Sequence, residues 1–139
     1  MLVAVHRIAG FVVVGLFATG WVWGLGAKLA KRGPGERFWW WLTAAQVSLG
    51  IQAILGISLY LTGHRVESTG LLGGTLHYVY GALPIVLLVY AHAVARAGNA
   101  SLVGLDPARQ IAPWVPFAWA SFICFGLTLR ALMTGLGVG

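Results

Sequence analysis

The sequence predicts an all-α membrane protein, in which a single domain over residues 1–139 forms a bundle of four transmembrane helices. Hydrophobic residues make up 59% of the chain and charged residues only 9%, and the mean hydropathy is +0.85. A soluble domain carries roughly 25% charged residues. The apolar residues also gather in four runs, and each run has the roughly 20 residues that are needed to cross the hydrocarbon core of a bilayer.

The four predicted helices cover residues 5–27, 38–62, 76–96 and 113–136. The first ends before Gly33–Gly35, where glycine and proline break a helix. The second opens with Trp39–Trp41, an aromatic belt typical of a membrane interface. The third contains Pro84, which membrane helices tolerate when neighbouring groups satisfy the freed backbone. The fourth follows a polar segment in which Asp106-Pro107 is a turn signal.

The basic residues lie in short loops between the apolar runs. The loops after the first and third helices hold Lys28, Lys31, Arg32, Arg37, Arg96 and Arg109, whereas the other side holds Arg7, Arg65 and Arg130. Cytoplasmic loops carry the excess of Lys and Arg, so both termini are predicted on the outer side of a prokaryotic cell membrane. We therefore read the net charge of +6 as orienting the chain in a lipid bilayer, and no nucleic-acid partner is expected.

Two predicted helices begin with a similar pattern. His6 is followed four residues later by Gly10, and His77 is followed four residues later by Gly81. Both histidines lie near the outer ends of their helices, so their imidazoles are predicted at the same membrane depth. Two imidazoles on separate helices of a bundle are typical axial ligands of a haem iron. A glycine one turn away is predicted to leave a bare backbone patch beneath each imidazole, which suits the edge-on packing of a flat macrocycle.

Other polar residues on the same side complete the predicted site. Arg7, Arg65 and Arg130 are candidate partners for the haem propionates. His64 is an alternative ligand, although it lies in a glycine-containing loop. Glu67 is the carboxylate placed on that side to move protons. His92 is predicted near the opposite interface, where the chain offers no histidine partner.

These residues resemble a known family. The pattern His6-Arg7-x-x-Gly10, then Gln52-x-x-Leu55-Gly56, then Leu76-His77 is similar to one half of a heme A synthase. Members usually have eight helices in two similar halves, each with a histidine pair for one haem. Compact members with a single four-helix unit look like this chain, and the resemblance covers the first three helices.

The resemblance implies oxidation of a methyl group of heme O to the formyl group of heme A, with His6 and His77 as axial ligands. The bound group would be heme b, or heme O and heme A as substrate and product. A half-length unit implies pairing with a second copy, so a homo-oligomer is expected. The chain departs from the family at Val3, where a glutamate is usual, and it lacks the outer-loop cysteine pair of many bacterial members.

Two other functions remain open from the residues alone. One is a b-type cytochrome subunit that exchanges electrons with quinol in a respiratory complex. The other is a haem-free packing subunit or small transporter. Proteins that assemble a respiratory oxidase would be suitable partners both for a b-type cytochrome subunit and for a heme A synthase.

Overall fold

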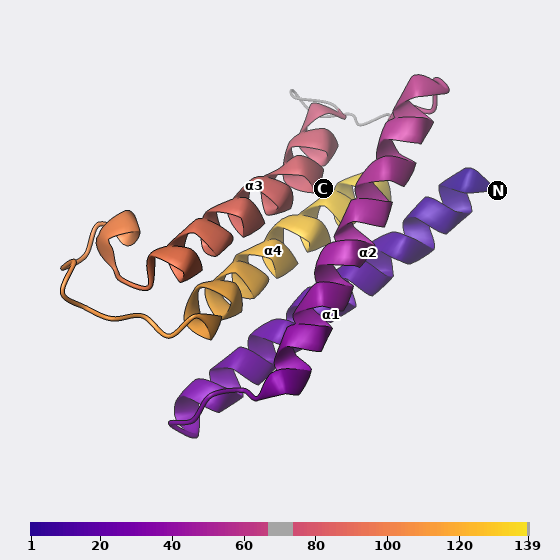
Figure 1. The fold of residues 1–139 in the computed structure, drawn as a ribbon. Helices are drawn as coiled ribbons and strands as arrows, with labels where there is room; N and C mark the ends of the chain where they lie inside the picture. Colours follow the sequence, from indigo (N-terminus) through magenta and orange to yellow (C-terminus); the bar gives the residue numbers. More distant parts are fainter. Residues whose placement is uncertain (67–73, 139) are drawn as a thin grey trace.

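The computed structural model describes residues 1–66 and 74–138, and these residues form four long helices and one short 3-10 helix (Figure 1). The elements are α1 (Leu2–Leu29), α2 (Glu36–Leu61), α3 (Thr75–Ala97), η1 (Ser101–Val103) and α4 (Trp114–Gly135). The predicted all-α bundle is confirmed. The largest difference in bounds is at the first helix, which begins at Leu2 rather than Val5, because the apolar run continues to the N-terminus.

Each of the four long helices is long and apolar enough to cross a membrane. Large apolar side chains such as Ile8, Ile54 and Val86 point outward and are about two-thirds exposed, at 65% each. Exposed apolar surface of this extent, spread over several helices, is unfavourable in water and suits contact with lipid. The chain therefore has the architecture of a multi-pass membrane protein.

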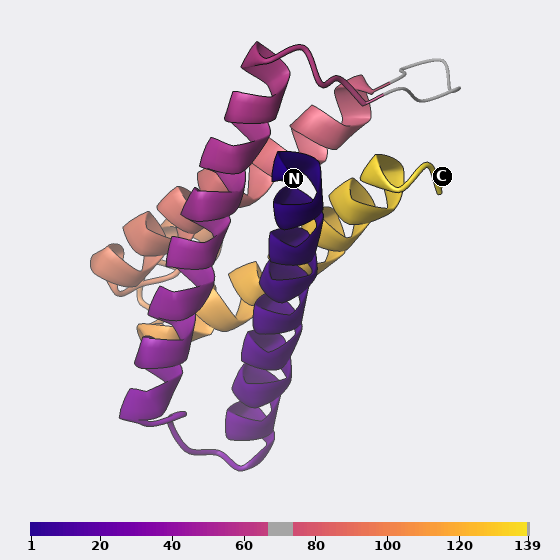
Figure 2. The same ribbon diagram turned by 90° about the vertical axis from the view of Figure 1, so that its right-hand side faces the viewer.

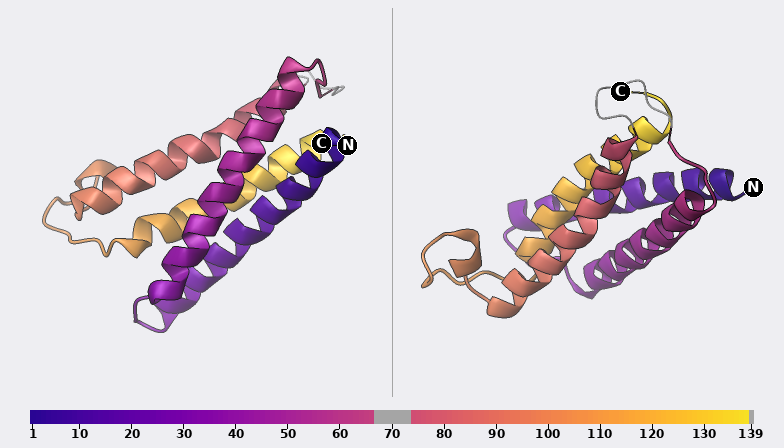
Figure 3. Two further views of the ribbon diagram at one scale, coloured as in Figure 1. Left: turned by 45° about the vertical axis from the view of Figure 1, so that its right-hand side comes forward. Right: turned by 90° about the horizontal axis from the view of Figure 1, so that it is seen from above.

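The four long helices do not form a closed ring. They pack side by side in the spatial order α2, α1, α4, α3. α1 packs against both α2 and α4, and α4 packs against α3, whereas α2 and α3 make few direct contacts (Figures 1 and 3). Between α2 and α3, the Tyr60 and Tyr78 rings meet edge to face with centres 5.3 Å apart. Nearer the other end, His92 Nε2 lies 3.3 Å from Gln46 Oε1. α1 and α3 therefore flank α4 on opposite sides.

Small residues bring α1 and α4 together. A Cβ atom at Gly24 would lie 2.5 Å from the Cβ of Ala118, so only glycine permits this approach. α1 and α2 are joined by Trp41, whose indole N–H donates to the backbone oxygen of Leu16 at 3.0 Å. Close backbone approach and interhelical hydrogen bonds are the usual sources of stability for helices in lipid.

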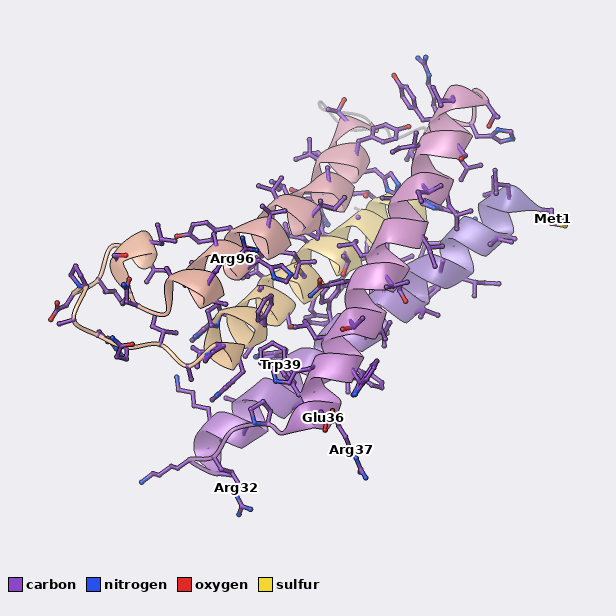
Figure 4. The ribbon with its side chains drawn as sticks, viewed as in Figure 1. Met1, Arg32, Glu36, Arg37, Trp39 and Arg96 are labelled. Carbon is purple, nitrogen blue, oxygen red and sulfur yellow. The ribbon has the colours of Figure 1, made fainter. Side chains whose placement is uncertain are left out.

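Both termini lie at the end of the bundle where α2 connects to α3 (Figure 2). Met1 is at one end, and Arg32, Glu36 and Arg37 are at the other, where α1 connects to α2 (Figure 4). We refer to these as the terminal end and the basic end. The assignment of the terminal end to the outer side of the membrane stays a prediction from the charge distribution.

Candidate functional site

His6 of α1 and His77 of α3 come together at the terminal end, with His6 packed against α2 and His77 against α4. Their ring centres are 6.1 Å apart and the ring planes make an angle of 66°. A metal–imidazole nitrogen bond is about 2.0–2.1 Å long, and the ring centre lies about 1 Å beyond the nitrogen, so two imidazoles on opposite sides of one metal have centres about 6 Å apart. The observed separation fits two imidazoles on opposite sides of one metal ion, and it is equally that of an ordinary edge-to-face contact between two rings.

His77 is held by α4 in a defined tautomer. Its Nδ1 lies 2.8 Å from the backbone oxygen of Ala131. Because a carbonyl oxygen only accepts, Nδ1 carries the proton, and the lone pair of a neutral ring is on Nε2. The ring also lies over Gly135, where a Cβ atom would be 3.0 Å from His77 Cε1. Metal-binding histidines are typically oriented by such a hydrogen bond from the other ring nitrogen.

His6 is positioned by α2 and is less completely satisfied. A Cβ atom at Gly56 would lie 3.2 Å from His6 Cε1, so the ring packs on bare backbone. Gln52 Nε2 lies 3.5 Å from His6 Nε2. His6 Nδ1 and Gln52 Oε1 are buried without any hydrogen-bond partner. Buried polar atoms are nearly always partnered in native proteins, so two such atoms on neighbouring residues are consistent with a site that a ligand or water completes.

The glycines under the imidazoles are Gly56 and Gly135, not the expected Gly10 and Gly81. Gly10 instead packs against Gln52, while a Cβ at Gly81 would meet no atom within 4 Å. Both Gly10 and Gly81 line the cavity described below. The sequence contained a signal for Gly56, because Gln52 and Gly56 are four residues apart and share one face of α2. No comparable signal marked Gly135.

A cavity of about 570 Å³ lies between the four helices at the terminal end, and both His6 and His77 line it. Its volume is within the roughly 300–1,000 Å³ of small-molecule and cofactor pockets. The walls are mainly apolar, and two predicted propionate partners, Arg7 and Arg65, are among the lining residues. Arg65 also lies over the Tyr60 ring, with its guanidinium carbon 5.1 Å from the ring centre.

The remaining predicted residues have different positions. His64 lines the cavity but is exposed, and its Nδ1 lies 3.3 Å from Thr62 Oγ1. Arg130 is exposed and is not among the lining residues. Glu67 lies outside the described residues. His92 is nearer the basic end, where its ring centre is 4.7 Å from that of Phe117.

The residues present fit a haem better than a bare metal ion. Within residues 1–66 and 74–138, no three His, Cys, Asp or Glu side chains gather in a way that could hold a metal. A haem macrocycle supplies the equatorial ligands itself and needs only two axial ones. His6 and His77, the apolar cavity and the two arginines match that requirement.

Comparisons of this chain with protein-family models, with curated proteins and with solved structures give no match.

Proposed function

We propose that the chain is a membrane haem protein that binds one haem between His6 and His77, and that it acts as a compact heme A synthase-like oxidoreductase. The observation that carries the proposal is the 6.1 Å separation of the two ring centres within an apolar cavity. The terminal end is assigned to the outer side of a prokaryotic cell membrane, and a homo-oligomer is the expected assembly.

Each residue of the site has a distinct part in holding the group. His77 binds through Nε2, because Ala131 fixes its proton on Nδ1, and this hydrogen bond makes the ring a stronger ligand. His6 provides the second imidazole, and Gln52 beside it restricts the orientation of the ring. Arg7 and Arg65 provide positive charge for the two carboxylates of the haem edge. A bound haem would supply a reversible one-electron centre.

Oxidation of a methyl to a formyl group (R–CH3 + H2O → R–CHO + 4 H⁺ + 4 e⁻) takes its oxygen from water and releases four electrons and four protons, so the reaction needs an external electron acceptor and a proton path. Glu67 is the proposed proton acceptor on the predicted outer side. A haem takes one electron at a time, so the four electrons are proposed to leave for an external oxidant of the quinone class.

Haem binding is tested by pyridine haemochrome analysis of purified wild-type protein and of the His6→Ala and His77→Ala variants. The wild type is expected to carry one haem per chain, and each variant is expected to lose most of it. His92→Ala is the matched control, because it removes an imidazole that does not line the cavity, and it is expected to keep full haem content. Full retention in both ligand variants would contradict the proposal, and loss in His64→Ala with retention in His6→Ala would move the ligand to His64.

Catalysis is tested separately by expressing the chain in cells that make heme O and analysing extracted haems by chromatography. Appearance of heme A that depends on His6, His77 and Glu67 is the expected result. Unchanged heme O with intact haem binding would remove the synthase proposal and leave the haem protein.

One observation favours a second function, a b-type electron-transfer subunit of a respiratory complex. If both His6 and His77, whose ring centres are 6.1 Å apart, held the haem, they would leave no open position on its iron. A haem of this kind carries electrons without binding a substrate directly. Reversible reduction by quinol without haem modification, together with stable co-purification with a larger complex, would support this alternative. A colourless preparation from haem-replete cells would instead indicate a haem-free packing subunit.

A further inference from the structure

A second cavity lies at the basic end, separate from the haem site. It has a volume of about 740 Å³ and is formed by the end of α1, by α3, by the α3–α4 connection and by the start of α4. Four basic residues line it: Lys28, Lys31, Arg32 and Arg109. None of the described residues that line it is Asp or Glu. The cavity therefore combines concentrated positive charge with a wall of membrane helices.

The deeper wall of this cavity is apolar and aromatic. Leu87, Val94 and Ile123 line it together with Trp114 and Trp119. Tryptophan is typical of the interface between lipid headgroups and acyl chains. The cavity thus has the two parts that an amphiphilic anion needs, a basic rim and an apolar wall.

The end of α1 holds two of the cations in an unusual backbone conformation. Arg32 N–H donates to the Ala27 oxygen at 3.1 Å and Lys31 N–H to the Lys28 oxygen at 3.1 Å, which is the Schellman pattern at a helix C-terminus. Lys31 occupies the left-handed position of this motif, with φ of 53°. Glycine is the usual residue there because a side chain is disfavoured. A lysine at this position suggests that its charge is needed.

The α3–α4 connection supplies the facing arginine from an ordered turn. Ala100 N–H donates to the Arg109 oxygen, and Ile111 N–H donates to the Gly98 oxygen, both at 3.0 Å. These bonds tie the two arms of the connection together. Lys28, on the opposite wall, lies over the Trp119 ring, with Nζ 5.6 Å from the ring centre. Backbone bonds therefore order the segments that carry Lys31, Arg32 and Arg109, and the exposed Lys28 is the one of the four with a described side-chain contact.

We propose that this cavity binds an anionic phospholipid, with the headgroup phosphate among Lys28, Lys31, Arg32 and Arg109 and an acyl chain along Leu87 and Ile123. A basic pocket between transmembrane helices is a recognised type of binding site for anionic lipid headgroups. The occupant is a lipid rather than a soluble anion because much of the wall is apolar and belongs to helices long and apolar enough to cross a membrane. This site is independent of the haem proposal.

The test is native mass spectrometry of the purified full-length protein in detergent, titrated with dioleoyl phosphatidylglycerol. The test variant is Arg32→Gln/Arg109→Gln, which removes two cations from the cavity lining. The matched control is Arg37→Gln/Arg96→Gln, which removes the same two charges from residues outside the lining. Each Lys or Arg near an anionic lipid contributes about 1 kcal/mol, so the test variant is expected to bind the lipid about 30-fold more weakly, at about 1.4 kcal/mol per tenfold. The control is expected to stay within about threefold of wild type.

Three results would overturn the proposal. One is equal weakening in the test and control variants, because that would indicate surface charge in general. Another is equal binding of dioleoyl phosphatidylcholine by the wild type, because that would show no preference for an anion. The third is displacement of the lipid by millimolar inorganic phosphate, because that would identify the ligand as a free anion.

Lys31→Gly separates lipid binding from folding. Glycine adopts the left-handed conformation without strain, so the thermal unfolding temperature of the delipidated variant is expected to equal or exceed that of wild type. Its affinity for phosphatidylglycerol is nevertheless expected to fall about fivefold, because one cation is lost. Unchanged affinity would show that Lys31 does not contact the headgroup and would contradict the proposed site.

Discussion

Replacement of Gly135 by alanine probes the proposed haem site without removing either proposed ligand. A Cβ atom at this position would be 3.0 Å from His77 Cε1 and 3.2 Å from His77 Nδ1. Carbon atoms in favourable contact are about 3.5–4.0 Å apart. The imidazole must therefore move away from α4 by about 0.5 Å, which would stretch its 2.8 Å hydrogen bond to Ala131 beyond the usual limit of about 3.2 Å.

The expected consequence is weaker haem binding with an intact fold. Loss of the hydrogen bond that orients a metal-binding histidine typically lowers metal affinity by about 10–100-fold, which is about 1.4–2.7 kcal/mol. The haem dissociation rate of Gly135→Ala is expected to rise by a factor in that range. It is measured by following the Soret absorption of purified protein after adding an excess of a haem-scavenging protein.

Two further substitutions provide the comparison. Gly56→Ala places a Cβ 3.2 Å from His6 Cε1 and is expected to show a smaller increase in dissociation rate. Gly126→Ala lies on the same helix as Gly135, and its Cβ would meet no atom within 4 Å, so it is expected to behave as wild type. If Gly135→Ala and Gly126→Ala released haem at the same rate, His77 would not be an axial ligand in the orientation described above.

Two substitutions test the packing of α1 against its neighbours, using thermal unfolding in detergent. Gly24→Ala is expected to destabilise the bundle by about 1–3 kcal/mol, because its Cβ would be 2.5 Å from the Cβ of Ala118. The control Gly26→Ala, whose Cβ would have no neighbour within 4 Å, is expected to be neutral or slightly stabilising. Equal effects of the two substitutions would argue against close α1–α4 contact. Trp41→Phe removes the N–H that donates to the Leu16 oxygen, and it is expected to lower the free energy of unfolding by about 1 kcal/mol. An unchanged unfolding temperature would show that this hydrogen bond contributes nothing to the α1–α2 contact.

The sequence by itself determined the helices and their order along the chain. In lipid, a backbone must satisfy its own hydrogen bonds, so an apolar run of sufficient length becomes a helix whatever its neighbours are. This is why the bounds of α2, α3 and α4 are within about two residues of those predicted. The depth of His6 and His77 was also predictable, because it follows from their positions near the ends of two helices that cross in the same direction.

Only the tertiary structure decided which residues surround those histidines. Spacing along one helix shows which residues share a face, and on that basis Gly10 and Gly81 were expected beneath the imidazoles. The rings instead turn toward neighbouring helices, where they meet Gly56 of α2 and the Ala131–Gly135 turn of α4. Which helix packs against a given face depends on the fit of side chains from segments far apart in the chain, and that information is not present in the spacing of any one segment.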